Sequence, residues 1–263
     1  MRERYVKRRL RNGNAMLRAA AILVGFLAAM ASAARAQRLD EIRVGSPALQ
    51  AVSLRLGMDS VENYAVNGAE RRLTATTVRT VTRLGSPPDA SYEIATRHWT
   101  VQGDTGWSTM VVRASDLSLV FHRVKAARDS AVVTAAGGHL SGWVVLPNQP
   151  VRLWDLTPGG GVFGVEGQIP WLVPLLPLAP DYTASVIRFS QWEGREVRDT
   201  IRVIGSERVT LEAHSYDCWQ VDMGALGPPG YRMIRWIDKE TRRVVQSVLK
   251  GESGPEYWSY LRS

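Results

Sequence analysis

From Arg71 onward the chain is a succession of short apolar segments, each closed by a turn signal. Valine, threonine, isoleucine, tryptophan and tyrosine dominate these segments, and half-buried strands prefer such residues. Glycine, proline and asparagine mark the turns. Because connections this short cannot hold the crossover that parallel strands need, neighbouring strands should pair antiparallel. The pattern therefore predicts an all-β protein with little helix.

The predicted strands are too numerous for a flat sheet. They span residues 73–84, 91–102, 107–113, 118–124, 140–146, 183–192, 197–204, 209–213, 219–223, 231–237 and 243–249. A sheet of about eleven strands rarely stays flat and open, so we expect one strongly bent antiparallel sheet, a half-barrel or barrel-like clam. Predicted turns include Asn67-Gly68, Gly137-Gly138, Gly205-Ser206 and residues 227–230. The one expected helix spans residues 46–55, where Ser46 precedes a first-turn proline.

Residues 169–180 break the strand pattern. The segment is almost wholly apolar but carries four prolines, which exclude a regular helix and a central strand. Apolar side chains at this density should not remain in water. They either cap the core of the domain, line a ligand site or dock a partner. As ligand-binding residues at the entrance of an apolar site we predict Trp171, Leu172, Leu175 and Leu176.

The N-terminal region has the layout of a secretory signal peptide. An arginine-rich segment precedes the apolar residues 19–33, and Ala34-Arg35-Ala36 follows with small residues suited to signal peptidase. We predict a signal peptide over residues 1–36, cleaved after Ala36, with translation starting at Met1 or Met16. The mature chain, 37–263, is then one β-rich domain that is periplasmic or secreted. It has no integral membrane segment, because no second apolar run approaches membrane-spanning length.

The charge of the mature chain argues against a nucleic-acid partner. The whole sequence carries a net charge of +8, but residues 1–36 hold eight basic residues and one acidic residue. Without them, 25 basic and 24 acidic residues remain, a net charge of +1. A phosphate-backbone binder needs a strong basic surface, which this balance does not provide.

No set of residues has the spacing of a catalytic or metal centre. His214 and Cys218 share one predicted strand face, but at roughly 3.3 Å per residue they lie about 13 Å apart, beyond hydrogen-bond reach. The other histidines show no metal-ligand spacing. A two-carboxylate glycosidase site stays open only if Glu93, Asp104, Glu193, Glu196 and Asp217 converge in space. We therefore predict no catalytic residues, no metal and no cofactor, and favour a binding protein over an enzyme.

Three motifs in the C-terminal half carry a family resemblance. They are Leu175-Leu-Pro-Leu-x-Pro-x-Tyr182, Tyr216-Asp-Cys-Trp-x-Val221 and Ile234-x-Trp-Ile-Asp-Lys-x-Thr-Arg-x-Val244. In these motifs the chain resembles a family of bacterial exported proteins of unknown function, which shares the bent-sheet architecture of the lipoprotein-localisation carriers of the cell envelope. The resemblance implies a curved sheet around an apolar cavity with an apolar loop or lid. It defines no catalytic residue.

The leading functional prediction is an exported binding or carrier protein whose bent sheet shelters an apolar ligand such as a lipid. One alternative is a cell-envelope interaction or scaffold module without a small-molecule ligand, in which residues 169–180 dock another protein. The other is a secreted hydrolase.

Overall fold

Two strand meanders form one continuous sheet. The computed structural model describes residues 40–50, 54–160, 163–224 and 231–262, and 40–263 forms one compact unit. The sheet has fifteen strands in the order β1-β10-β11-β12-β13-β14-β15-β2-β3-β4-β5-β6-β7-β8-β9. The strands of the first part of the chain are β1 Asp40–Ile42, β2 Gly57–Asn67, β3 Glu70–Leu84, β4 Ser91–Thr100, β5 Thr105–Arg113, β6 Leu119–Lys125, β7 Ser130–Ala136, β8 His139–Val145 and β9 Arg152–Leu156. Those of the second part are β10 Thr183–Ser190, β11 Arg195–Leu211, β12 His214–Asp222, β13 Tyr231–Asp238, β14 Val244–Gly251 and β15 Glu256–Leu261.

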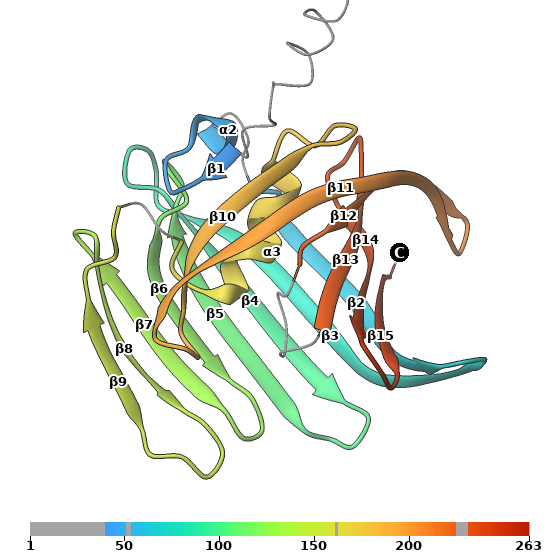
Figure 1. The fold of residues 1–263 in the computed structure, drawn as a ribbon, viewed down its shortest axis with the longest axis horizontal. Coiled ribbons are helices and arrows are strands. Elements are labelled where there is room, and N and C mark those ends of the chain that lie inside the picture. Colours follow the sequence, from blue (N-terminus) through green and yellow to red (C-terminus); the bar gives the residue numbers. More distant parts are fainter. Residues whose placement is uncertain (1–39, 51–53, 161–162, 225–230, 263) are drawn as a thin grey trace, which may run out of the picture. The chain divides into compact units, whose positions relative to one another are not determined.

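The last strand joins the two meanders. Strand β15 pairs antiparallel with β2, and their register runs from Glu256 opposite Val66 to Leu261 opposite Val61. All other neighbouring strands are also antiparallel, apart from the short parallel pair β1 and β10. The sheet bends strongly and is not closed by strand pairing in its described part, as Figure 1 shows. The predicted all-β fold with a bent antiparallel sheet is confirmed.

Local turn chemistry explains the hairpins. Between β7 and β8, Gly137 and Gly138 both have positive φ, 58° and 82°, which a two-residue type I′ turn requires. The turn predicted at Gly205-Ser206 is wrong. Strand β11 runs straight through these residues, and its pairing with β12 shifts register between Val203 and Gly205. The glycine therefore marks a β-bulge, the other common role of an isolated glycine inside a strand pattern. The turn predicted at residues 227–230 lies outside the described residues.

Five strands have no counterpart in the sequence prediction: β1, β2, β7, β9 and β15. Strand β2 is rich in polar residues, and β9 has only five residues, so neither has a strong alternating pattern. The predicted N-terminal helix is present but short. Helix α2 spans Pro47–Gln50, and Arg55 lies outside any helix; residues 51–53 are outside the described ranges.

The proline-rich segment forms no strand in its described residues, and its helical turns are only three or four residues long. A 3₁₀ turn η1, Glu166–Gln168, leads into α3, Ile169–Leu172, and a second 3₁₀ turn η2, Val173–Leu175, follows. Pro170 lies in the first turn of α3 and Pro174 in the first turn of η2. Proline is tolerated in a first turn because the missing N–H would have no partner there.

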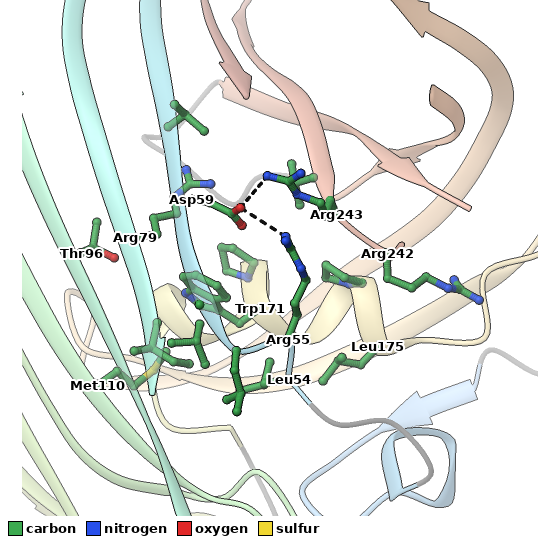
Figure 2. Close-up of a pocket in the computed structure, with 18 of the residues that line it drawn as sticks. Leu54, Arg55, Asp59, Arg79, Thr96, Met110, Trp171, Leu175, Arg242 and Arg243 are labelled. Atoms are coloured by element: carbon green, nitrogen blue, oxygen red, sulfur yellow. Dashed lines mark hydrogen bonds and ion pairs between the residues drawn. The ribbon is translucent and has the colours of Figure 1, made fainter. Parts of the chain in front are cut away.

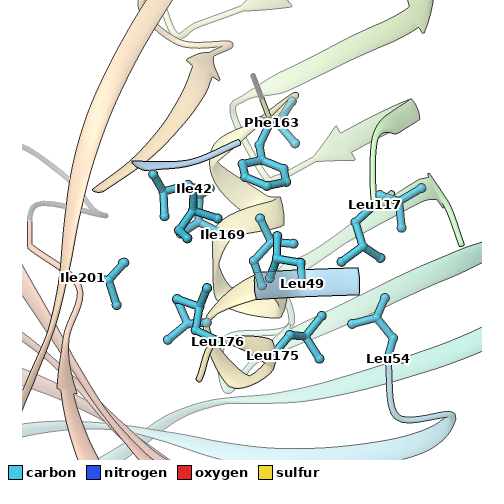
Figure 3. Close-up of a cluster of buried hydrophobic side chains, with 14 of the residues drawn as sticks. Ile42, Leu49, Leu54, Leu117, Phe163, Ile169, Leu175, Leu176 and Ile201 are labelled. Atoms are coloured by element: carbon cyan, nitrogen blue, oxygen red, sulfur yellow. The ribbon is translucent and has the colours of Figure 1, made fainter. Parts of the chain in front are cut away.

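The place of this segment in the fold explains why it is apolar. It connects β9, at one edge of the sheet, to β10, which lies next to the other edge, and the bend of the sheet brings these two strands together, with the ring centroids of Trp154 and Phe189 5.7 Å apart. The connection passes through the concave side, where Ile169, Leu172 and Leu176 are at most 2% exposed. They pack with residues such as Ile42, Leu49 and Ile201 in the main core (Figure 3). The core is therefore built between the curved sheet and this connection.

Candidate functional site

A cavity of about 410 Å³ remains between α3–η2 and the concave face of the sheet. Strands β2 to β6 form its floor, α3 and η2 form one wall, and the β13–β14 hairpin closes another side (Figure 2). Arg55, Leu56 and Thr241 line it and are exposed, so the cavity reaches solvent between the segment before β2 and the β13–β14 turn. The volume lies within the range of roughly 300–1,000 Å³ typical of small-molecule sites.

Strand register gives the floor two parallel rows of side chains. One row is polar and consists of directly paired residues from four strands, Asp59, Arg79, Thr96 and Ser108. The adjacent row is mainly apolar and consists of Val81, Ile94, Met110 and His122. Alternate residues of a strand face the same side, so each of β3, β4 and β5 contributes one residue to each row. The floor therefore presents a polar strip beside an apolar strip.

The four predicted ligand-binding residues divide into two pairs. Trp171 and Leu175 line the cavity, together with Pro170 and Pro174. Leu172 and Leu176 are not among the lining residues, and they are 2% and 1% exposed within the main core. Leu175 also contacts this core. The segment thus covers the domain's own core with one face and forms a cavity wall with the other.

Asp59 is the one carboxylate among the described lining residues, and two arginines already share it. Nη2 of Arg243 donates to Oδ1 of Asp59 at 2.7 Å, and Nη1 of Arg55 donates to the same oxygen at 3.2 Å (Figure 2). Arg243 therefore ties the β13–β14 turn to β2 across the cavity mouth.

Two further arginines lie deeper. Arg235 is 6% exposed, and its Nη1 donates to the carbonyl oxygen of Pro170 at 3.2 Å. This bond holds the start of α3 against β13. Burial and, secondarily, the positive charge of Arg79 lower the pKa of Arg235 to about 9. Burial also lowers the pKa of Arg79, while nearby Asp59 acts in the opposite direction. The two guanidinium groups thus repel each other at the cavity.

His122 ends the apolar row and is neutral. Its Nδ1 lies 3.0 Å from Oε1 of Gln191, which accepts the ring proton. Burial lowers the pKa of His122 to about 4, although the hydrogen bond to Gln191 opposes this shift. At neutral pH the ring adds a hydrogen-bonding group to the cavity but no charge.

The other chemical candidates from the sequence lie away from the cavity. Cys218 is fully buried on the convex face in a small cluster with Trp236 and Val248. Burial, with a smaller effect of Asp238, raises the pKa of its thiol to about 12, so the thiol is not a nucleophile at neutral pH. His214 lies at the start of the same strand, with its ring next to Tyr216.

The five candidate carboxylates do not gather at a site. Glu193 and Asp104 lie in turns, Glu196 accepts a hydrogen bond from the backbone of Gly159, and Asp217 pairs with Lys239. Neither these residues nor Glu93 lines the cavity. Across the described ranges, no three His, Cys, Asp or Glu residues cluster closely enough to hold a metal ion.

Comparisons with known proteins identify a fold likeness and no family. Neither the family models nor the curated proteins include a match to this sequence. Among solved structures, the chain is similar to a β-barrel-like protein of the domain of unknown function DUF1849 from Brucella abortus. The two are 11% identical with a TM-score of 0.47, over 81% of this chain and 98% of the other. In the part of the chain described, no helix has the length and hydropathy to cross a membrane.

Sequence reasoning missed the charged residues of the cavity. In residues 231–237, the mixture of apolar and arginine positions predicts one buried and one wetter face. Arg232 is exposed, but Arg235 shares the concave face with Met233 and Ile237 and is buried. Arg232 and Arg235 face opposite sides of the sheet, because residues three apart in a strand point in opposite directions. The alternation of apolar and arginine positions could therefore have placed Arg235 on the buried face, whereas no local pattern indicates that Arg79 lines a cavity.

Proposed function

We propose that this chain is an exported binding or carrier protein whose cavity shelters an apolar or amphipathic ligand such as a lipid. The cavity between the concave sheet face and α3–η2 carries the proposal. Its walls include Val81, Ile94, Met110, Trp171 and Leu175, which supply an apolar surface that a ligand would cover. Leu56, 52% exposed, lies at the mouth and offers an apolar contact to an entering chain. The signal-peptide pattern of residues 1–36 supports export.

The scaffold alternative has less support. A docking surface made by residues 169–180 needs exposed apolar side chains, but Ile169, Leu172 and Leu176 are buried in the domain's own core. The hydrolase alternative is weaker still, because Asp59 is engaged by two arginines and no second carboxylate lines the cavity in the described residues. A two-carboxylate mechanism has no pair to use there.

The test fills the cavity with a side chain. Ser108 lies on the floor, whereas its neighbour Thr109 faces the other side of β5 and is not a lining residue. Binding of the neutral apolar probe N-phenyl-1-naphthylamine is followed by its fluorescence. We expect the parent protein to bind the probe, Ser108→Phe to weaken binding by about tenfold or more, and Thr109→Phe to leave it unchanged. Absence of binding by the parent protein, or equal effects of the two variants, would refute the proposal.

Two measurements on material from the native host complete the test. Lipid extraction and mass spectrometry should find acyl species that co-purify with the parent protein and are depleted in Ser108→Phe. The intact mass of the exported protein should correspond to a chain that begins at Gln37. Retention of Met1 or Met16 in the exported form would contradict the assignment of the signal peptide.

A further inference from the structure

The cavity has a strong excess of positive charge. Among the described residues, Arg55, Arg79, Arg235, Arg242 and Arg243 line it, against one carboxylate, that of Asp59. A purely apolar ligand would further desolvate these groups without supplying a counter-charge. Buried charges are normally paired because an unpaired ion loses its hydration without compensation. In the part of the chain that the structure describes, the lining therefore offers fewer negative charges than it has arginines.

Asp59 is not paired directly with either inner arginine. Its Oδ1 accepts from Arg243 and Arg55, while the side chain of Arg79, directly opposite Asp59 in the sheet register, feels the nearby carboxylate but makes no hydrogen bond or ion pair to a described residue. Arg235 has only the neutral carbonyl of Pro170 for its Nη1, and its buried Nε has no hydrogen-bond partner in the described part of the protein. Both guanidinium groups thus have donor capacity left at the cavity.

Their position on the floor sets the orientation of a ligand. Arg79 belongs to the polar row, where Thr96 and Ser108 supply further hydrogen-bonding groups. The apolar row of Val81, Ile94 and Met110 lies immediately beside it. An acidic head group on the polar row would place an attached alkyl chain along the apolar row. Such a ligand would match both strips, whereas a neutral one would match only the apolar strip.

We propose that the ligand carries a carboxylate or phosphate group, and that Arg79 and Arg235 hold this group inside the cavity. The inference rests on the proposed binding function and specifies its ligand class, an amphipathic acid. Guanidinium groups suit this task because they bind carboxylate and phosphate oxygens through two parallel N–H donors. The bound acid would also relieve the repulsion between the two arginines.

The experiment compares ligands of one chain length with different head groups. Titration calorimetry measures the binding of dodecanoate and dodecyl phosphate below their critical micelle concentrations, of neutral dodecanol below its solubility limit, and of inorganic phosphate and acetate without a chain. We expect either acidic amphiphile to bind at least about tenfold more tightly than dodecanol, which is the effect of one charge-assisted hydrogen bond. Dodecanoate and dodecyl phosphate distinguish a carboxylate from a phosphate preference. Free phosphate and acetate report any binding of the anion alone.

Substitutions of single arginines test which residues cause the preference for an acidic head group. Arg79→Gln should remove most of the preference for the acid and leave dodecanol binding unchanged. Arg83→Gln is the matched control, because Arg83 lies four residues further along β3 on the same face, is exposed, and does not line the cavity. Arg235→Gln should act like Arg79→Gln. Because Arg235 also holds α3 through Pro170, the thermal unfolding of the Arg235→Gln variant is measured in parallel. If that variant fails to fold, Arg79→Gln alone decides whether the arginines bind the acid group.

The outcomes separate the inference from the function on which it rests. Equal binding of dodecanol and both acids, with no effect of Arg79→Gln, overturns the acid-binding inference and leaves the proposed function standing. Absence of binding by every amphiphile overturns both. Binding of inorganic phosphate or acetate as tightly as the amphiphiles, lost in Arg79→Gln, supports the anion site but overturns a binding function for apolar chains.

Discussion

Neighbouring residues of α3 should have separable roles. Leu172 is 2% exposed in the main core, whereas Trp171 is half-buried and lines the cavity. Replacing a buried leucine by alanine costs about 2–5 kcal/mol, from lost burial and from the space left behind. For Leu172→Ala we take about 3 kcal/mol. In a domain of this size, a loss of about 1 kcal/mol lowers the melting temperature by roughly 2–4 °C, so Leu172→Ala should lower it by about 6–12 °C.

Trp171→Ala should behave in the opposite way. Part of the indole contacts the core but the rest faces the cavity, so we expect a smaller stability loss of about 1–2 kcal/mol. Binding of N-phenyl-1-naphthylamine should weaken several-fold, because the probe loses a wall of the site. In Leu172→Ala, measured well below its melting temperature, probe affinity should stay within about twofold of the parent value.

Thermal unfolding followed by circular dichroism, with probe titration on the same samples, checks both expectations. The reasoning fails if Trp171→Ala destabilises the protein as much as Leu172→Ala while its probe affinity equals that of the parent. Trp171 would then be a core residue and its contact with the cavity incidental. A neutral effect of Leu172→Ala on stability would show that α3 does not cover the core as described.

Two further predictions concern buried titratable groups. Because the pKa of His122 is about 4 in the folded protein and about 6.5 in the unfolded chain, acid favours the unfolded state as pH falls from about 6.5 to 4. Protonation linked to His122 should lower the free energy of unfolding by about 3 kcal/mol over that range, with no further loss below it. Urea unfolding at pH 7 and 4.5 should therefore show a smaller change in the free energy of unfolding for His122→Gln than for the parent protein. An equal change in both proteins would contradict the buried neutral ring. Cys218→Ala should leave probe binding unchanged with a modest loss of stability, and the native thiol should resist Ellman's reagent at pH 8, because it is fully buried and its pKa is raised to about 12. Loss of binding at an unchanged melting temperature would instead assign Cys218 a functional role.

Much of the fold could be predicted because its signals are local. The hairpin between β7 and β8 needs two residues of positive φ, and the adjacent glycines Gly137 and Gly138 predict this turn from the sequence alone. The apolar character of residues 169–180 likewise indicated a segment that covers a core or a site. Local signals fail where one residue type has two uses, as at Gly205, which allows a turn or a bulge. There, pairing along the rest of β11 with β12 favours one continuous strand.

The site depended on contacts that no local pattern encodes. The pairing of β15 with β2 joins strands from opposite ends of the domain, and this junction brings the β13–β14 turn to the mouth of the cavity beside Asp59. The polar row that includes Asp59, Arg79 and Thr96 exists only through the registers of successive strands. By itself the sequence determined a bent antiparallel sheet and an apolar segment that had to be buried, because turn chemistry and side-chain alternation act over a few residues. Only the tertiary structure decided that Arg79 and Arg235 share one cavity, because strand order and the bend of the sheet set which distant side chains meet.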